Sequence, residues 1–174
     1  MRPTASYDID LLRKFWRLSR QDRLLLLEAI LWLAIAGLAI AVLPFRQVGF
    51  LAARRIRQRE LPRTARLNKL RRIRWAILST AARVPWTALC FQKGLAAHLM
   101  LRRRGIPSVL YYGAAQDDKD GLHAHVWVRD GDFEVIGGEV AHRFVVLAAF
   151  PPVDMDKVQK PPSEDQGTWS EACA

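Results

Sequence analysis

The sequence predicts an α+β fold, in which a helical N-terminal half is followed by one helix packed on a small antiparallel sheet. The first observation is a long apolar run from Ala29 to Phe45 with an arginine-rich stretch behind it. The second is a change in the residue pattern after Gly105, where short apolar runs alternate with polar turns. The third is length, because 174 residues are enough for one domain of ordinary size with a real core.

The first predicted helix carries the apolar run. "SRQD", from Ser19 to Asp22, resembles a capping box at its start. The 17 residues from Ala29 to Phe45 contain no charge, which is at the lower edge of a membrane-spanning length. The run therefore indicates either a very apolar core helix, a helix that packs on a partner, or one that is embedded in or associated with a membrane. The arginines behind it would favour the cytoplasmic side of a membrane for that flank.

Residues 46–75 predict two basic helices separated at Pro62, because proline removes a backbone donor from a helix interior. Their arginines indicate a solvated face or a docking face for an acidic peptide or an anionic lipid. Nucleic acid is not an expected partner, since no groove-reading motif or stacking aromatics accompany them. Residues 1–105 hold 22 Lys and Arg against 5 Asp and Glu, whereas residues 106–174 hold 5 against 12. This asymmetry favours an acidic partner or surface.

The next helix begins near the first of the two cysteines. Thr87 is the predicted N-cap, which puts Cys90 in the first turn of a helix that ends before Gly105. Free N–H groups and the helix dipole at such a position lower the pKa of a thiol. Cys90 is thus either a small core residue or a nucleophile. The other cysteine, Cys173, lies near the end of the chain, and this usage suits a reducing compartment.

Four strands are predicted after Gly105. They are "IPSVLYYGAA", "LHAHVWVR", "FEVIGG" and "RFVVLAAF", with "QDDKDG" and "DGD" as the first two turns. The Pro-rich and charged residues 151–174 predict a loose tail. The expected organisation is a basic helical region over residues 1–80, a core over residues 81–150, and a tail over residues 151–174.

The second strand supplies a candidate base. Alternation puts His123, His125 and Trp127 on the same face of the strand. A histidine on a strand beside the start of a packed helix can serve a cysteine as general base, with an acidic group to orient the imidazole. The acids in reach are Asp130, Asp132, Glu134 and Glu139. Hairpin geometry favours Glu139, because Asp132 sits in the turn further from His125.

No metal or cofactor is expected. The His123-x-His125 pair is a metal half-site by spacing, but no further ligands are obvious beyond the distant His98 and His142. No secretory signal is visible, so the expected location is cytoplasmic, with membrane association left open by the apolar run.

At this point the sequence resembles a known family. "VPWTALCFQKGLAAHLMLRRRGIPSVLYYGA", "HAHVWVRDGDFEVIGG" and "RFVVLAAF" together resemble the B2 proteins of lasso peptide biosynthesis, which are transglutaminase-like cysteine peptidases. The matching block runs from Val84 to Phe150, and the apolar run with "LPFR" is similar to the same family. The resemblance implies a transglutaminase/papain-like core that removes the leader peptide from a ribosomally made precursor. It implies three partners: the precursor peptide, a separate leader-binding (B1-type) protein and an ATP-dependent lasso cyclase. No leader-recognition domain is evident in the chain, as expected for such a split system.

The resemblance also implies roles for individual residues. By position Cys90 matches the nucleophile and His125 the general base. The family's acid is normally an aspartate after the second hairpin strand, and here Glu139 stands near that place. The third member is therefore Glu139, or Asp132, or the cysteine–histidine dyad suffices. Two other functions stay open: a transglutaminase-like amidase or acyltransferase, and a non-catalytic basic adaptor at a membrane or partner surface.

Overall fold

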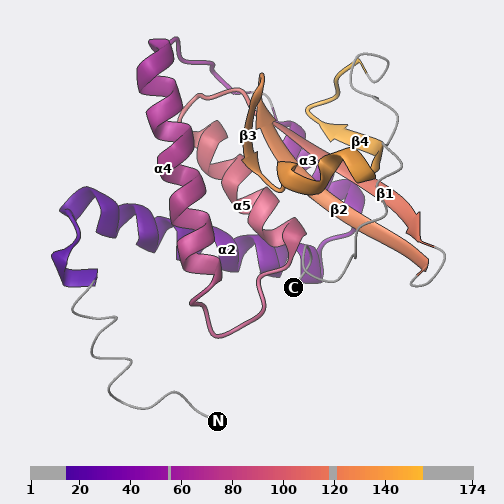
Figure 1. Ribbon diagram of the computed structural model, residues 1–174, viewed down its shortest axis with the longest axis horizontal. Coiled ribbons are helices and arrows are strands. Elements are labelled where there is room, and N and C mark those ends of the chain that lie inside the picture. Colours follow the sequence, from indigo (N-terminus) through magenta and orange to yellow (C-terminus); the bar gives the residue numbers. More distant parts are fainter. Residues whose placement is uncertain (1–14, 55, 118–120, 155–174) are drawn as a thin grey trace.

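The computed structural model describes residues 15–54, 56–117 and 121–154 and confirms the α+β prediction. In the described residues the helices lie on one face of a four-stranded antiparallel sheet, and a short 3-10 helix connects the last two strands (Figure 1). Cys173, the predicted tail beyond residue 154 and the centre of the first hairpin turn lie outside the described residues.

Helix α2 (Arg20–Val42) carries the apolar run. The Ser19 hydroxyl oxygen accepts a hydrogen bond from the N–H of Asp22 at 3.1 Å, which confirms the predicted cap. One face of the helix is buried against α4 and α5. The opposite face is exposed and forms what we call the outer stripe of α2, made of Leu24, Leu27, Leu31, Ile35, Leu38 and Val42. By length and composition α2 could cross a membrane, yet it also serves as a core helix, and a soluble or a membrane-associated protein would fit.

The arginine-rich stretch forms helices α3 (Phe45–Ala53) and α4 (Arg63–Ala81), and Pro62 caps the second of them. The break between the two helices is longer than predicted, because residues 54 and 56–62 are not helical. Proline disfavours helical backbone in Leu61, the residue before it. The N–H of Arg59 is used instead in a 2.9 Å hydrogen bond to the carbonyl oxygen of Gly105, which ties the segment to the end of α5.

Helix α5 (Cys90–Arg103) lies at the centre of the molecule and contacts α2, α4 and the sheet. Gly94 permits its close approach to strand β2, since a Cβ atom there would lie 2.6 Å from a methyl carbon of Val126. Gly37 plays the same part in α2, where a Cβ atom would lie 2.2 Å from the Gln92 side-chain nitrogen. Gly105 follows the helix with φ 71°, as predicted for a C′ glycine.

The sheet consists of β1 (Val109–Asp117), β2 (Gly121–Asp130), β3 (Phe133–Ile136) and β4 (Val145–Phe150) in the order β3-β2-β1-β4. All neighbouring strands are antiparallel, and Gly131 with φ 57° makes the predicted tight turn between β2 and β3. The 3-10 helix η1 (Gly138–Arg143) was not predicted. Val126 and Val128 face the helical core, whereas Trp127 packs in a second cluster on the opposite face.

His98 is a structural residue of this core. Its Nε2–H donates to the carbonyl oxygen of Ala52 at 2.9 Å, and its Nδ1 accepts from the hydroxyl of Ser108 at 2.9 Å. The imidazole thereby links α3, α5 and the start of β1. Burial lowers the pKa of His98 from 6.5 to about 4; the hydrogen bond to Ala52 opposes this shift, and the charge of Arg102 adds to it.

We expect the free energy of unfolding to fall as the pH drops from 6.5 toward 4. In this pH window His98 becomes protonated in the unfolded chain but stays neutral in the folded chain. The free energy of unfolding therefore falls by an amount on the order of 3 kcal/mol. Urea unfolding at neutral pH and near pH 4 measures it. His98→Gln should flatten this dependence, whereas a similar flattening by His142→Gln, an exposed control, would contradict the assignment.

Candidate active site

Cys90 is the first residue of α5 and is half-buried. The prediction that Thr87 is the N-cap is wrong, because the N-cap of α5 is Leu89, which has an extended backbone. Gln92 explains the difference: its side-chain oxygen accepts a 3.0 Å hydrogen bond from the N–H of Leu89 and so satisfies the backbone at the helix start. Cys90 therefore lies in the first turn of the helix, where the helix dipole favours negative charge.

The start of α5 is packed against strand β2. Cys90 and Gly94 are one turn apart and share a face of the helix, and Gly94 touches Val126, the neighbour of His125 in the chain. The ring of Phe91 lies 6.3 Å from that of Tyr112 on β1, directly across from Val126. The charge of Lys93, in the same turn, lowers the pKa of His125. The first turn of α5 thus lies against β2 close to His125 in the chain, on the face to which Val126 points, whereas the His125 ring lies with Trp127 on the other face.

His125 is 2% exposed and is held on three sides. Its ring stacks on Trp127 at 6.1 Å and on Phe144 at 4.9 Å between centroids. Its Nε2 lies 2.9 Å from the carbonyl oxygen of Gly137, and because a carbonyl can only accept, Nε2 carries the hydrogen. The neutral ring then has its lone pair on Nδ1, which is buried and has no hydrogen-bond partner among the described residues.

Burial lowers the pKa of His125 below its ordinary value. The hydrogen bond to Gly137 and the charge of Glu139 oppose this shift, and the charge of Lys93 adds to it. The imidazole is consequently neutral at pH 7 and available as a proton acceptor at Nδ1.

Gly137 holds the carbonyl that fixes this ring. Its φ is 73°, a left-handed conformation that suits glycine. A Cβ atom at this position would lie 2.6 Å from the carbonyl oxygen of Val126 and 3.1 Å from Nε2 of His125. The close approach of β3 to β2 at His125 therefore requires glycine here.

Glu139 lies two residues further on, in η1, with its side chain 59% exposed. Its carboxylate is paired with Arg74 of α4, which also donates to the carbonyl oxygen of Val135 at 2.9 Å. Burial would raise the pKa of Glu139. The hydrogen bond from Arg74, one from its own backbone and the charges of Arg74 and His125 outweigh that effect and lower the pKa. Glu139 is therefore a carboxylate within electrostatic range of His125, while Gly137 occupies Nε2.

The other candidate acids lie elsewhere. Asp132 is exposed in the turn beyond Asp130, and Asp130 is five positions along β2 from His125, about 16 Å at strand spacing. The carboxylate of Asp130 is engaged on both oxygens by Arg66 of α4. The side chain of Glu134 lies against Gly138.

Sequence reasoning missed Gly137, Phe144 and Arg74. The "VIGG" ending of the third strand is the signal that could have revealed a left-handed glycine, and nothing near Arg74 in the sequence could have linked it to Glu139. His123 is half-buried, and His142 is exposed. Within the described ranges no three His, Cys, Asp or Glu side chains gather as metal ligands would.

Comparison with known proteins gives one match. Residues 32–149, about two thirds of the chain, match the family model described as "Transglutaminase-like superfamily". The matched range includes α3, α4, α5 and nearly all of the sheet, together with Cys90, His125 and Glu139. No curated protein and no solved structure matches the chain.

Proposed function

Because this chain belongs to the transglutaminase-like superfamily, whose members are commonly cysteine-dependent enzymes, we propose that it is a cysteine peptidase that removes the leader from a lasso peptide precursor. The observation that carries a cysteine–histidine reaction is the imidazole of His125, anchored through Nε2 and left with a buried, unpartnered Nδ1. The finer assignment to lasso precursors is supported by the resemblance of the blocks around Cys90, His125 and "RFVVLAAF".

In this proposal the first half-reaction is acyl transfer to Cys90. Nδ1 of His125 takes the thiol proton, and the thiolate attacks the carbonyl carbon of the scissile peptide bond. The backbone N–H of Cys90, at the helix N-terminus, donates to the developing oxyanion. The C–N bond breaks as the imidazolium returns its proton to the leaving amine, and the leader remains as a thioester on Cys90.

The second half-reaction is hydrolysis of that thioester. His125 takes a proton from water, the water oxygen attacks the thioester carbon, and the C–S bond breaks. The leader leaves with a new carboxylate, and the proton returns to the Cys90 sulfur. If an amine took the place of water, the same site would perform acyl transfer.

We assign different tasks to the two groups that support His125. The carbonyl of Gly137 fixes the tautomer and the orientation of the ring through Nε2. Glu139 acts through its charge, which raises the proton affinity of His125 and so stabilises the imidazolium. Arg74 holds the Glu139 carboxylate in place. The proposed triad is therefore Cys90, His125 and Glu139, with the acid at longer range than a direct hydrogen bond.

The proposal includes the partners that the resemblance implies: the precursor peptide, a separate leader-binding protein and an ATP-dependent lasso cyclase. Cleavage would free the N-terminus that the cyclase joins to an acidic side chain. Of the other candidate functions, an acyltransferase would share the thioester step, whereas an adaptor would not need a reactive Cys90.

Incubation with a candidate precursor and its leader-binding partner in ¹⁸O-labelled water, followed by mass spectrometry, tests the function. We expect two fragments, with the heavy oxygen in the new carboxylate of the leader. Cys90→Ala should slow this release at least about 1000-fold, since the proposal places the thioester on the Cys90 sulfur. Cys173→Ala is the matched control and should process normally.

Two other results would contradict the proposal. Processing that survives Cys90→Ala would exclude the cysteine peptidase. A leader that gains the mass of an amine in place of the oxygen label would replace hydrolysis by acyl transfer.

A further inference from the structure

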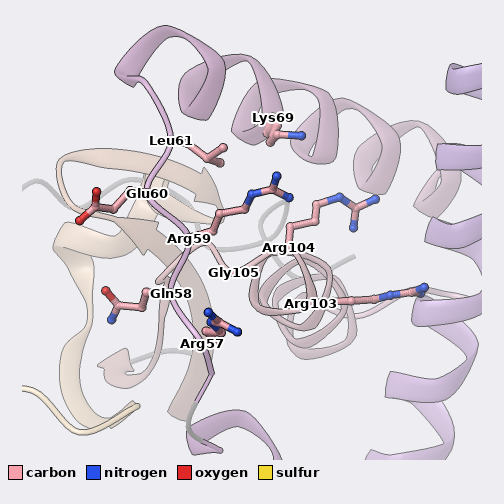
Figure 2. Close-up of a pocket in the computed structure, with 9 residues that line it drawn as sticks. All are labelled: Arg57, Gln58, Arg59, Glu60, Leu61, Lys69, Arg103, Arg104 and Gly105. Carbon is pink, nitrogen blue, oxygen red and sulfur yellow. The ribbon is translucent and has the colours of Figure 1, made fainter.

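A hollow lies at the opposite end of α5 from Cys90. Its volume is about 720 Å³, and it is bounded by the extended segment of residues 57–61, by α4 and by the last turn of α5 (Figure 2). Its cationic lining consists of Arg57, Arg59, Lys69, Arg103 and Arg104. We call it the basic groove.

The positive charge of the basic groove exceeds the negative charge near it. Glu28 pairs with Arg104, with atoms 2.9 Å apart in one of two contacts, and more distantly with Arg103 at 3.7 Å. Over the described ranges, Arg57, Arg59 and Lys69 have no ion pair. The basic groove therefore carries an excess of positive charge that ion pairs within the described residues do not neutralise.

The groove is built by the backbone. The N–H of Arg59 donates to the carbonyl oxygen of Gly105 at 2.9 Å, and a Cβ atom on Gly105 would lie 2.9 Å from the carbonyl oxygen of Arg57. This close tie holds the segment extended across the end of α5. Side chains alternate along extended chain, so Gln58 and Glu60 point away while Arg59 extends toward the same space as Lys69 and Arg104 (Figure 2).

We propose that the basic groove binds carboxylate side chains in an acidic stretch of the peptide substrate, at a distance from the scissile bond. This inference rests on the proposed peptidase function and adds to it a second contact with the leader. The guanidinium groups of Arg57 and Arg59 provide planar forks that match carboxylates, and Lys69 adds a point charge.

A peptide fits the groove better than nucleic acid does. The lining contains no aromatic side chain on which a base could stack, and its one large apolar residue is Leu61.

The length of α5 sets the spacing between the two contacts. Its 14 residues extend over about 20 Å from Cys90 to Arg103. An extended peptide advances about 3.3 Å per residue. The acidic residues are therefore expected at least about six positions from the scissile bond, on the leader side.

Fluorescence anisotropy with the full chain tests the groove without turnover. The probe is a dye-labelled peptide of alternating glutamate and serine, compared with the same peptide carrying glutamine in place of glutamate. We expect only the glutamate peptide to bind, and Arg57→Gln with Arg59→Gln to weaken it at least about tenfold. Arg17→Gln with Arg71→Gln removes the same charge from exposed positions outside the groove and should change the affinity less than about twofold.

Equal losses in the two double variants would overturn the proposal, since attraction would then depend on net charge alone. Equal competition by single-stranded DNA would overturn it too, in favour of a general polyanion surface. If a protein that does not bind the probe still cleaves the precursor, the peptidase function stands, and the basic groove is excluded as a substrate-binding site. Conversely, probe binding without any cleavage would sink the peptidase function alone.

Discussion

Replacing His125 by glutamine is expected to slow precursor cleavage by about 10²- to 10⁴-fold, the range typical of a lost general base. The amide nitrogen of glutamine can still donate to the carbonyl of Gly137, but no lone pair remains where Nδ1 was. His123→Gln is the matched control, because His123 lies two residues away on the same strand face. It should stay within about threefold of the parent rate, as expected for a neighbour of the site.

The pH profile gives a second readout of His125. The neutral imidazole is the active form, so the rate should rise with pH through the pKa of His125. Burial puts that pKa below 6.5, and the acid limb of kcat/KM should lie there. Glu139→Gln removes a charge that raises this pKa, and the limb should move to lower pH. A limb that stays in place would contradict the role given to Glu139.

Gly137→Ala should damage the site more than its size suggests. The new methyl group would meet the carbonyl oxygen of Val126 at 2.6 Å, and φ 73° is itself unfavourable for alanine. We expect stability to fall by about 2 kcal/mol and the melting temperature by several degrees. Cleavage should fall at least about tenfold at a temperature where the variant is folded, because the carbonyl that orients His125 must move.

Gly131→Ala separates backbone strain from this positioning effect. Gly131 also has positive φ, 57°, but a Cβ atom there would have no neighbour within 4 Å. Its substitution should cost about 1 kcal/mol and leave the rate unchanged. Thermal unfolding and cleavage rates measured on both variants check this. Equal activity losses in the two would show that the carbonyl of Gly137 has no special part.

The sequence was most informative where a local rule governs the backbone. Ser19 as a cap, Gly105 after α5 and the turn at Gly131 are each set by the chemistry of neighbouring residues. The shared face of His125 and Trp127 likewise follows from strand alternation, and their stacked rings confirm it.

Contacts between distant elements could not be predicted in this way. The cap at Leu89 depends on the turn that reaches Gln92, whose side chain packs under Gly37 of α2. The pairing of Arg74 with Glu139 joins residues 65 positions apart. The hydrogen bond from His125 to Gly137 depends on how closely β3 approaches β2. Each is a consequence of tertiary packing, which no local pattern in a single sequence encodes.

The outer stripe of α2 has a colloidal consequence. Six large aliphatic side chains face outward along a helix whose other side is already in the core, and such a patch favours self-association when nothing covers it. The net charge of +10 opposes this, because like-charged molecules repel one another over a Debye length. Salt shortens the Debye length and so weakens the repulsion that opposes contact between the outer stripes of two molecules. Added salt is therefore expected to promote self-association of molecules in which the outer stripe of α2 is uncovered.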